Sequence, residues 1–269
     1  MQADINQLEF IRHSRYPLEA RRASFSQPIF KKHYHDTYAI GMVEDGASRF
    51  SWMRAGCLVQ PGAVVLLNPG EVHVCNSLPD STWTYRMIYL EPAWVADSLS
   101  PAEFTARVVT QPALYHSLCR LYESLKNPLA VLENDCLLTE SLSLLFEKYG
   151  SMRQTKSGAQ PSLSLREARA YLMDHLCENI PLQQLSAVAG LSSYHLLRSF
   201  RQAYGVPPHT YQNLQRIQRA RRLINRGSEP LSRLALSLGF SDQSHFTRVF
   251  KESFGISPGR YQQICRQID

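Results

Sequence analysis

The first third of the chain breaks into short apolar and aromatic runs separated by turn-forming residues. Between Phe25 and Leu90 the runs read YAIGMV, SRFSWM, CLVQ, AVVLLN and TYRMIYL, and the breaks include EDG, RAG, NPGE and LPDS. Short strands with turns at this spacing are typical of antiparallel sandwiches and barrels. The pattern therefore predicts a β-barrel or sandwich within residues 1–100.

The period of the apolar residues changes after residue 101. Segments 102–126 and 129–148 carry apolar residues at i, i+3 and i+4, which predicts amphipathic helices, and one use of their apolar faces is packing on the barrel. The stretch GSMRQTKSGAQPS that follows has no aromatic or branched aliphatic residue. Such a composition favours a flexible tether, so we expect a linker at 150–163 and a separate domain at 164–269.

The C-terminal part contains one pattern written twice. The first copy reads PLQQLSAVAGLSSYHLLRSFRQAYGVPPHTYQ, and the second reads PLSRLALSLGFSDQSHFTRVFKESFGISPGRYQ. In each copy a proline can open a helix, and Gly190 or Gly239 permits the left-handed turn that ends it. A second helix begins at once, so the copies predict two helix-turn-helix motifs, at about 181–204 and 230–254.

The second helix of each copy has one apolar and one polar face. Ser192 and Ser241 precede these helices and are predicted to be their N-caps. The polar faces hold side chains of the kinds that reach base edges and phosphates when a helix enters a major groove. The candidate DNA-binding residues are Ser193, Tyr194, His195, Arg198, Arg201, Asp242, Gln243, Ser244, His245, Thr247, Arg248 and Lys251.

Some of these side chains are better suited than others to read bases. Gln pairs with adenine, Arg with guanine and Asp with a cytosine amino group. For His195 and His245 we favour a contact with the DNA backbone or packing at the helix start. The sharper candidates for base recognition are Tyr194, Arg198, Asp242, Gln243 and Arg248.

Duplication makes the motif more specific. A single helix-turn-helix also occurs in all-α folds that bind no nucleic acid. Two copies joined by one long helix, at 208–225, form a far rarer pattern. If the two second helices lie about 34 Å apart, both can enter successive major grooves on one side of the duplex.

The positive charge of the chain is concentrated in this C-terminal part. The chain has 29 Lys+Arg and 23 Asp+Glu; from residue 160 onward there are 14 basic and 7 acidic residues, against 15 and 16 before it. A basic domain neutralises phosphates, so its affinity for DNA should fall as salt rises. The candidates for this sequence-independent contact are Arg201, Arg216, Arg219, Arg221, Arg222, Arg226, Lys251 and Arg260.

Residues 165–265 resemble the DNA-binding domain of AraC/XylS-type transcription regulators. The resemblance is carried by AVAGLSSYHLLRSFRQAYGVPPHTYQNLQRIQRARRLI and LALSLGFSDQSHFTRVFKESFGISPGRYQ, in which GFSDQSHFTRVFK is very specific. It implies a bacterial promoter binder, usually an activator, with seven helices in this domain. It also implies double-stranded DNA, RNA polymerase and a second copy of the chain as partners. Segment 101–149 would then be a helical dimerisation segment, with Leu138, Leu142 and Leu145 at the interface.

The predicted barrel contains a further set of motifs. His33-Tyr34-His35 precedes one strand, and a G-x6-P-G-x-x-H-x-x-N pattern runs from Gly62 to Asn76. Both resemble cupin motifs, and AraC-type regulators often carry a cupin-like sensor in this place. The resemblance implies a small-molecule effector whose candidate contacts are His33, His35, Glu71 and His73.

Metal binding by the barrel is the alternative use of these residues. A cupin metal site normally adds a Glu four or five residues after the HxH pair, but here Ala39 and Ile40 stand at those positions. We therefore expect no cofactor. In the alternative, His33, His35 and His73 hold a divalent ion, and the protein is a cupin enzyme, such as a dioxygenase or isomerase, fused to a DNA-binding domain.

Neither a membrane nor secretion is indicated. No run of about eighteen apolar residues occurs, and MQADINQLEF lacks a basic region followed by an apolar core. Six cysteines without C-x-x-C spacing favour reduced thiols. We thus expect a cytoplasmic, non-enzymatic homodimer with a two-domain α+β fold: a cupin-like barrel or sandwich with following helices, and an all-α double helix-turn-helix. Its expected function is ligand-responsive control of transcription.

Overall fold

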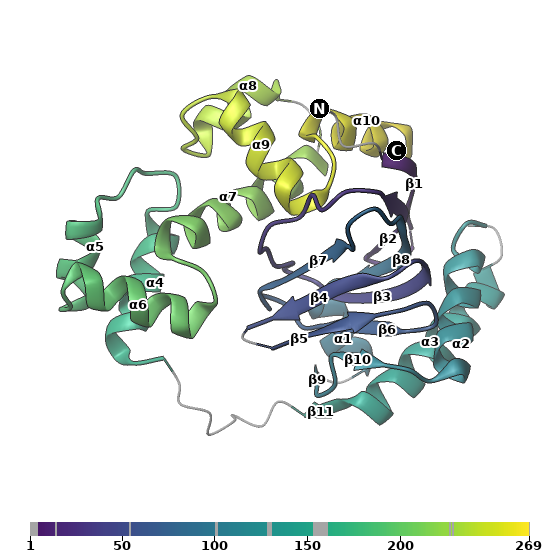
Figure 1. Ribbon diagram of the computed structural model, residues 1–269. Coiled ribbons are helices and arrows are strands. Elements are labelled where there is room, and N and C mark those ends of the chain that lie inside the picture. The colour runs from purple at the N-terminus through teal and green to yellow at the C-terminus, as the bar shows by residue number, and fades with distance from the viewer. Residues whose placement is uncertain are drawn as a thin grey trace. The chain divides into compact units, whose positions relative to one another are not determined.

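A computed structural model describes residues 5–13, 15–53, 55–99, 102–127, 131–152, 161–225, 227 and 229–268 (Figure 1). The chain forms two compact units, and their division is not simply N-terminal against C-terminal. The first consists of Met1–Ile29 and His35–Thr155, and the second of Phe30–Tyr34 and Lys156–Asp269.

The first unit is built on two antiparallel sheets and a short strand pair. The larger sheet has the order β1-β2-β8-β3-β6-β10, the smaller has the order β5-β4-β7, and β9 pairs with β11. The strands are β1 Ile5–Arg12, β2 Leu18–Phe25, β3 Tyr38–Asp45, β4 Ser48–Trp52, β5 Ala55–Val59, β6 Val64–Leu67, β7 His73–Ser77, β8 Trp83–Leu90, β9 Ala102–Phe104, β10 Val108–Val109 and β11 Gly150–Met152.

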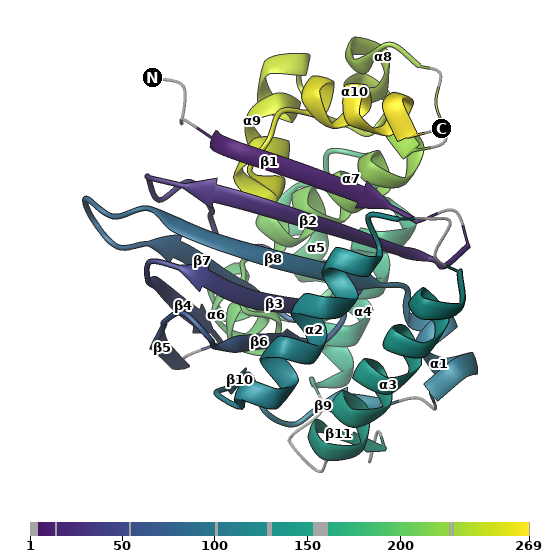
Figure 2. The same ribbon diagram turned by 90° about the vertical axis from the view of Figure 1, so that its right-hand side faces the viewer.

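One face of the larger sheet packs against helices. These are α1 Pro92–Leu99, α2 Pro112–Ser124 and α3 Val131–Tyr149, and Figure 2 shows α2 and α3 crossing the sheet. Successive side chains of a strand point to opposite faces. On β2, Leu18 and Ala20 therefore join the apolar core under the helices, whereas Arg21 lies on the other face.

Ion pairs join this helical layer to the larger sheet. The Glu44 carboxylate accepts a hydrogen bond from Arg22 at 2.6 Å and forms an ion pair with Arg86 at 2.5 Å. Arg86 also reaches Glu123 of α2 at 3.0 Å. Arg22 thus lies on the helix side of β2, next to Arg21 in the chain but on the opposite face.

Two parts of the middle segment differ from the prediction. Residues 102–110 were expected to be helical but hold β9 and β10, because the β-branched Val108 and Val109 pair with β6 and the helix begins only at Pro112. Residues 150–152 were expected in the linker but form β11, paired with β9. The rest of that linker, 153–160, lies outside the described residues.

The three leucines expected at a dimer interface lie in the core of the first unit. Leu138, Leu142 and Leu145 are 4%, 1% and 0% exposed and belong to the apolar cluster between α3 and the sheet. This burial corrects their assignment, because a side chain enclosed by its own unit is not available to a second chain. The helical pattern was compatible with a dimer interface and with packing inside the unit, and the structure shows packing on the sheet.

The second unit is helical apart from its short N-terminal segment. Its helices are α4 Leu163–Asp174, α5 Leu182–Ala189, α6 Ser193–Tyr204, α7 Pro208–Asn225, α8 Leu231–Ser237, α9 Gln243–Phe254 and α10 Pro258–Ile268. Figure 1 shows α7 running from the group of α4, α5 and α6 to the group of α8, α9 and α10. A sheet-rich unit followed by an all-α unit confirms the predicted α+β fold class.

Segment Phe30–Tyr34 completes the second unit although it comes from the N-terminal part of the chain. Lys31 forms an ion pair with Glu252 of α9 at 2.6 Å. The buried Gln218 of α7 donates from Nε2 to the Tyr34 carbonyl at 2.7 Å, and the Tyr34 ring stacks on Tyr211. Nothing in the repeat pattern predicted this segment, because its partners are about two hundred residues away in the chain.

Two buried polar side chains of α7 hold the two helix-turn-helix motifs to one another. The Arg216 guanidinium, only 4% exposed, donates to the carbonyls of Leu176 at 2.7 Å, Glu178 at 2.8 Å and Gly239 at 2.8 Å. Gln212 Nε2 donates to the same Leu176 and Glu178 carbonyls, at 3.2 and 2.9 Å. The first two carbonyls precede α5 and the third follows α8, so one arginine fixes both motifs on α7.

The close approach of these groups depends on Gly239. Its φ is +81°, and a Cβ there would lie 2.2 Å from the Cys177 carbonyl oxygen and 2.8 Å from the Arg216 guanidinium. Gly190, in the matching turn of the first motif, also has a positive φ, +61°, but a Cβ there would meet nothing within 4 Å. The two glycines therefore share a backbone conformation and differ in the space around them.

We predict that Gly239→Ala destabilises the protein far more than Gly190→Ala. The left-handed conformation alone costs an L residue about 1–2 kcal/mol. At position 239 the added methyl must also displace the Arg216 hydrogen bonds, which brings the expected loss to about 3 kcal/mol or more. Urea unfolding of both full-length variants, followed by circular dichroism, measures the difference, and equal losses would contradict the clamp.

Candidate functional site

The first candidate recognition helix is α6. The Ser192 side chain accepts from the His195 backbone N–H at 3.3 Å and so caps the helix, as predicted, and Gly205 ends it in the left-handed conformation. Leu196 and Phe200 are fully buried against the unit. The polar face is presented to solvent: Tyr194 is 75% exposed, and the other exposed candidates on it are His195, Arg198 and Arg201.

The second candidate recognition helix, α9, begins one residue later than expected. Its N-cap is Asp242 and not Ser241: the Asp242 carboxylate accepts from the His245 N–H at 2.7 Å and from the Ser241 hydroxyl at 3.0 Å. Asp is as good an N-cap as Ser, and the extra residue of this copy places it there. These two hydrogen bonds, the His245 N–H first, lower the pKa of Asp242. Its carboxylate is therefore engaged in holding the helix start.

The remaining candidates of α9 divide by exposure. Gln243, Ser244 and Arg248 are exposed, whereas Thr247 and Lys251 are half-buried. His245 has its ring edge against Phe240 at 5.4 Å and its Nδ1 within 3.2 Å of the Ser241 hydroxyl. Of the packing and backbone-contact roles expected for this histidine, the geometry supports packing. On α6, the Ser193 hydroxyl shares a hydrogen bond with the Ser186 hydroxyl at 3.0 Å.

Burial removes two arginines from the set expected to touch phosphates. Arg216 and Arg221 of α7 are 4% and 5% exposed, so neither guanidinium faces solvent, and Arg216 is bound to three carbonyls of its own unit. A helix that is buried on several sides turns some of its basic residues inward, which the charge count could not show. Arg226 lies outside the described residues. The exposed members of the set are Arg201, Arg219, Arg222 and Arg260.

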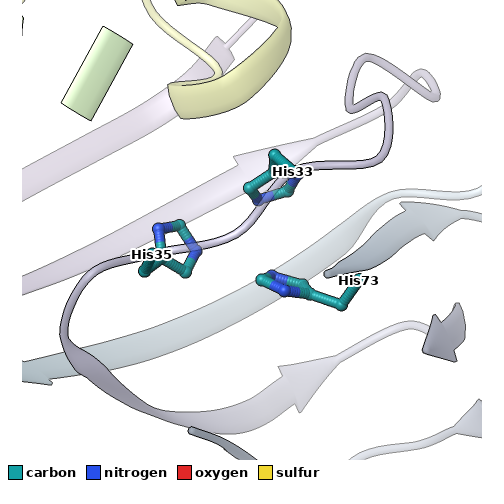
Figure 3. A group of neighbouring side chains, drawn as sticks. All are labelled: His33, His35 and His73. Carbon is teal, nitrogen blue, oxygen red and sulfur yellow. The ribbon is translucent and has the colours of Figure 1, made fainter. Parts of the chain in front are cut away.

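The three histidines of the cupin-like motifs come together (Figure 3). His33, His35 and His73 each offer one ring nitrogen, and these atoms all lie within 4.8 Å of one another. His73 Nδ1 lies 2.9 Å from the Glu71 carbonyl and His33 Nδ1 lies 2.8 Å from the Lys31 carbonyl. Because a carbonyl only accepts, Nδ1 carries the hydrogen in both rings and the lone pair is on Nε2.

The environment of His73 keeps it neutral. Burial lowers its pKa to about 4; the hydrogen bond with the Glu71 carbonyl acts against this, and the charge of Arg21 acts less strongly in the same direction as burial. A neutral imidazole offers one donor and one acceptor, or a nitrogen ligand for a metal ion. A neutral His73 adds no charge to the group, and what it offers a ligand is a hydrogen bond or a coordinating nitrogen.

The fourth expected effector residue, Glu71, is turned elsewhere. Its carboxylate is ion-paired with Arg107 and also accepts from the Asn68 backbone N–H at 3.3 Å. It does not belong to the histidine group, and its expected contact with the effector stays a prediction. Three imidazoles fit the nitrogen-donor preference of Zn²⁺, and the buried Ala39 and Ile40 add no ligand.

The sequence did not reveal the residues of the larger sheet that lie beside the histidine group. Arg21 of β2 is buried, with its guanidinium 5.4 Å from the Tyr85 ring centre and 5.5 Å from that of Tyr89. The Tyr89 ring meets His35 at 5.1 Å. The signal was an arginine at an inward position of a strand, but LEARRASF reads as too polar for a buried strand, so β2 was not recognised.

None of the helices in the described part of the chain is both long enough and apolar enough to cross a membrane.

Two family models match the two parts of the chain. A helix-turn-helix domain matches residues 185–264, which contain α6 and α9. An AraC-like ligand binding domain matches residues 15–145, which contain both sheets apart from β1.

Individual relatives and structures agree with these matches. YbfI of Bacillus subtilis strain 168, an uncharacterized HTH-type transcriptional regulator, is 30% identical over 235 residues, 85% of each chain. The HTH-type transcriptional activator RhaS of Escherichia coli O139:H28 is 26% identical over 233 residues, 82% of this chain and 83% of its own.

The whole fold is also similar to that of ToxT from Vibrio cholerae. The structure from strain O395 gives a TM-score of 0.56 at 15% identity and covers 96% of this chain and 97% of its own. An unsaturated fatty acid-bound ToxT gives 0.55 at 15%, covering 95% and 94%. With two recognition helices on one helical unit, a ligand-binding domain before them and a relative of this identity along most of its length, the chain belongs to the AraC family of HTH-type transcriptional regulators.

Proposed function

We propose that this regulator activates transcription when a small-molecule effector binds between the two sheets of its first unit. The observation that carries the proposal is the pairing of two exposed polar helix faces, on α6 and α9, with a buried polar group around His35 and His73. Activation is supported by the likeness to RhaS, a transcriptional activator. Binding of an effector is supported by ToxT, which has been crystallised with an unsaturated fatty acid.

The proposed DNA contact uses the exposed side chains of the two recognition helices. Tyr194 and Arg198 of α6, and Gln243 and Arg248 of α9, read bases in the major groove. Exposed arginines such as Arg219 add contacts with phosphates. The target is promoter DNA, and RNA polymerase is the partner through which activation acts, so the protein works in the cytoplasm.

Regulation requires that the effector bind two states of the protein unequally. A ligand shifts an equilibrium only by the difference in its affinity for the two states. The effector would thus favour the arrangement in which the helix-turn-helix motifs engage the promoter. An enzymatic cupin is the other use of the same residues, and chelator-sensitive turnover of a substrate would favour it, whereas reversible thermal stabilisation by an unchanged metabolite favours the sensor.

We predict that Gln243→Ala weakens binding at one base pair only. Loss of a bidentate contact costs about 1–3 kcal/mol on the matching base and nothing where that base is already changed. Ser192→Ala is the control: it removes the side-chain cap of the other recognition helix, α6, leaves the base-reading candidates in place, and weakens binding to every sequence alike. Titration of the full-length variants on an array of single-base operator variants measures both, and a uniform loss for Gln243→Ala would reject base reading there.

We predict that the pair His35→Ala and His73→Ala abolishes the effector response while DNA binding is kept. The full-length protein is first screened against organic metabolites by thermal stabilisation, and the stabilising compound is then used in a promoter reporter. His116→Ala, an exposed histidine of α2, is the matched control and keeps the response. Induction of the double variant at the wild-type level would rule out this part of the proposal.

A homodimer is the proposed assembly, and α3 offers a surface for it. Leu138, Leu142 and Leu145 are enclosed, and the apolar side chain that α3 exposes most is Leu132, at 77%, against 40% for Val131 and 38% for Leu144. Burying an exposed leucine against a second copy is favourable, and a charge at the same place opposes contact.

We predict that Leu132→Glu shifts the full-length protein from dimer to monomer in sedimentation. Leu236→Glu, at an equally apolar position of α8 that is 62% exposed, leaves the dimer intact. A monomeric wild-type protein at micromolar concentration would contradict the dimer, and an equal effect of both variants would contradict the place of the interface.

A further inference from the structure

Two buried polar side chains between the sheets lack a hydrogen-bond partner. Trp83 of β8 and Ser77 of β7 are 3% and 5% exposed, and in the described part of the chain nothing pairs with the Trp83 indole Nε1 or with the Ser77 hydroxyl. An indole N–H can only donate, whereas a hydroxyl can donate or accept. Buried polar groups are normally paired, so each of these two is a place where a bound molecule gains a hydrogen bond.

Strand alternation places both groups in the same interior. Ile88 of β8 belongs to the core under the helices, so Trp83, an odd number of positions away on a regular strand, faces the smaller sheet. Ser77 shares its face of β7 with Cys75. Burial chiefly raises the pKa of Tyr85, and the Cys75 thiol of the opposite sheet adds to it, so this face of β7 looks into the interior. A short turn joins the two strands, and both groups lie at its end of the sandwich.

Aromatic rings line this interior on both sheets. Trp83 stacks on Tyr85 with ring centres 4.3 Å apart, and Tyr85 stacks on Phe25 at 6.0 Å. On the smaller sheet Phe50 stacks on Trp52 at 4.9 Å, and the register of β4 with β7 puts both rings on the inner face. Aromatic faces of this kind favour a flat ligand, which stacks on them with an offset.

The other groups of this interior do not call for a charged ligand. Burial lowers the pKa of His73 to about 4 and raises that of the Cys75 thiol to about 12, so both are neutral at physiological pH. The Arg21 guanidinium has partners of its own in two tyrosine rings and in the charge of Glu19. A charged ligand would lose its hydration on entering, whereas a neutral carbonyl loses far less.

Small residues and one flexible side chain let the interior adapt. Ala39 and Gly41 of β3 lie on the inner face, in register with Tyr89 and Met87 of β8. A Cβ at Gly41 would lie 3.1 Å from Met87 Cε, so the Met87 side chain lies over the glycine. Methionine is unbranched and changes shape readily. Met87 is therefore the side chain that can move aside for a ligand.

We propose that the effector is a small, neutral, aromatic carbonyl compound whose oxygen acceptors pair with Trp83 Nε1 and the Ser77 hydroxyl. This rests on the proposed sensor function and names the chemical class of its ligand. A carbonyl oxygen has two lone pairs and accepts from N–H and O–H donors without bringing a charge. The flat ring attached to it stacks on the aromatic side chains of the two sheets.

The first test compares flat carbonyl compounds with compounds that lack one feature each. Coumarin and indanone are titrated against the full-length protein beside three others: indole is flat but donates, cyclohexanone has the carbonyl without an aromatic ring, and benzoate carries a charge. The readout is the melting temperature in differential scanning calorimetry. Coumarin and indanone should raise it at millimolar concentration, and the other three should raise it less. Equal shifts with indole or benzoate, or no shift with either carbonyl compound, would overturn the proposal.

Two tryptophan variants then locate the contact. Trp83→Phe keeps an aromatic ring but removes the donor, and should weaken binding of the stabilising compound roughly fivefold to a hundredfold, because the carbonyl is then buried without a partner. Trp94→Phe is the matched control: the replacement is the same, but Trp94 of α1 packs against the core under the helices and should leave the affinity unchanged. Wild-type affinity of Trp83→Phe would overturn the assignment.

The ligand-free stability of Ser77→Ala separates a binding role from a structural one. A hydroxyl without a partner contributes no hydrogen bond to the free protein, so Ser77→Ala should keep or raise the urea midpoint and still weaken the ligand. A lower midpoint with unchanged affinity would show that the hydroxyl serves the fold, which contradicts the proposal. The same variant carries the test if Trp83→Phe does not fold.

Binding of the wild-type protein to promoter DNA is measured in parallel. DNA binding without any effect of the carbonyl compounds would reject this ligand class and leave the proposed regulator. Absence of DNA binding by the wild-type protein, with and without the compounds, would reject the proposed function itself.

Discussion

The second unit depends on the hydrogen bonds that Arg216 makes with three carbonyl oxygens. A guanidinium in the interior is favourable only when its donors are satisfied, and here the acceptors belong to the segments before α5 and after α8. Those segments belong to the two motifs, so the hydrogen bonds of one buried cation link both motifs to α7. Gly239 follows from the same requirement, because only a residue without Cβ leaves room for the guanidinium.

In the first unit, too, the positions of arginine side chains distinguish the parts of the structure. Two consecutive arginines on β2 point to opposite faces of the larger sheet, since the side-chain period of a strand is two residues. Arg22 meets Glu44 at the edge of the helix-covered face, while Arg21 meets tyrosine rings in the enclosed interior. One face is thus closed by ordinary salt bridges and apolar packing, and the other retains polar chemistry. Alternation along a single strand separates the part that stabilises the unit from the part that can recognise a ligand.

Most of the fold was predictable because its signals are local. Prolines and left-handed glycines punctuate the helices of the repeat, and short apolar runs mark β3, β6 and β8. The failures came where distant residues decide. The sequence around Leu142 does not show whether the apolar face of the helix packs on its own sheet or on a second chain. Strand β2 was not predicted because the partners of its arginines lie far away in the sequence. For the candidate site, spacing found the three histidines but not Arg21, and it could not show that Glu71 is held by Arg107.

The contribution of Phe30–Tyr34 makes the helical unit discontinuous in sequence. Gln218 and Tyr34 are separated by 184 positions, yet they are joined by a hydrogen bond within one unit. A fragment that starts at residue 156 would therefore lack the stacking partner of Tyr211 and the ion-pair partner of Glu252. During synthesis from the N-terminus, the short segment leaves the ribosome long before α7 and α9 exist to receive it. These helices thus have to assemble around a segment that was made well before them, and the helical unit reaches its complete form only after α9 has been made.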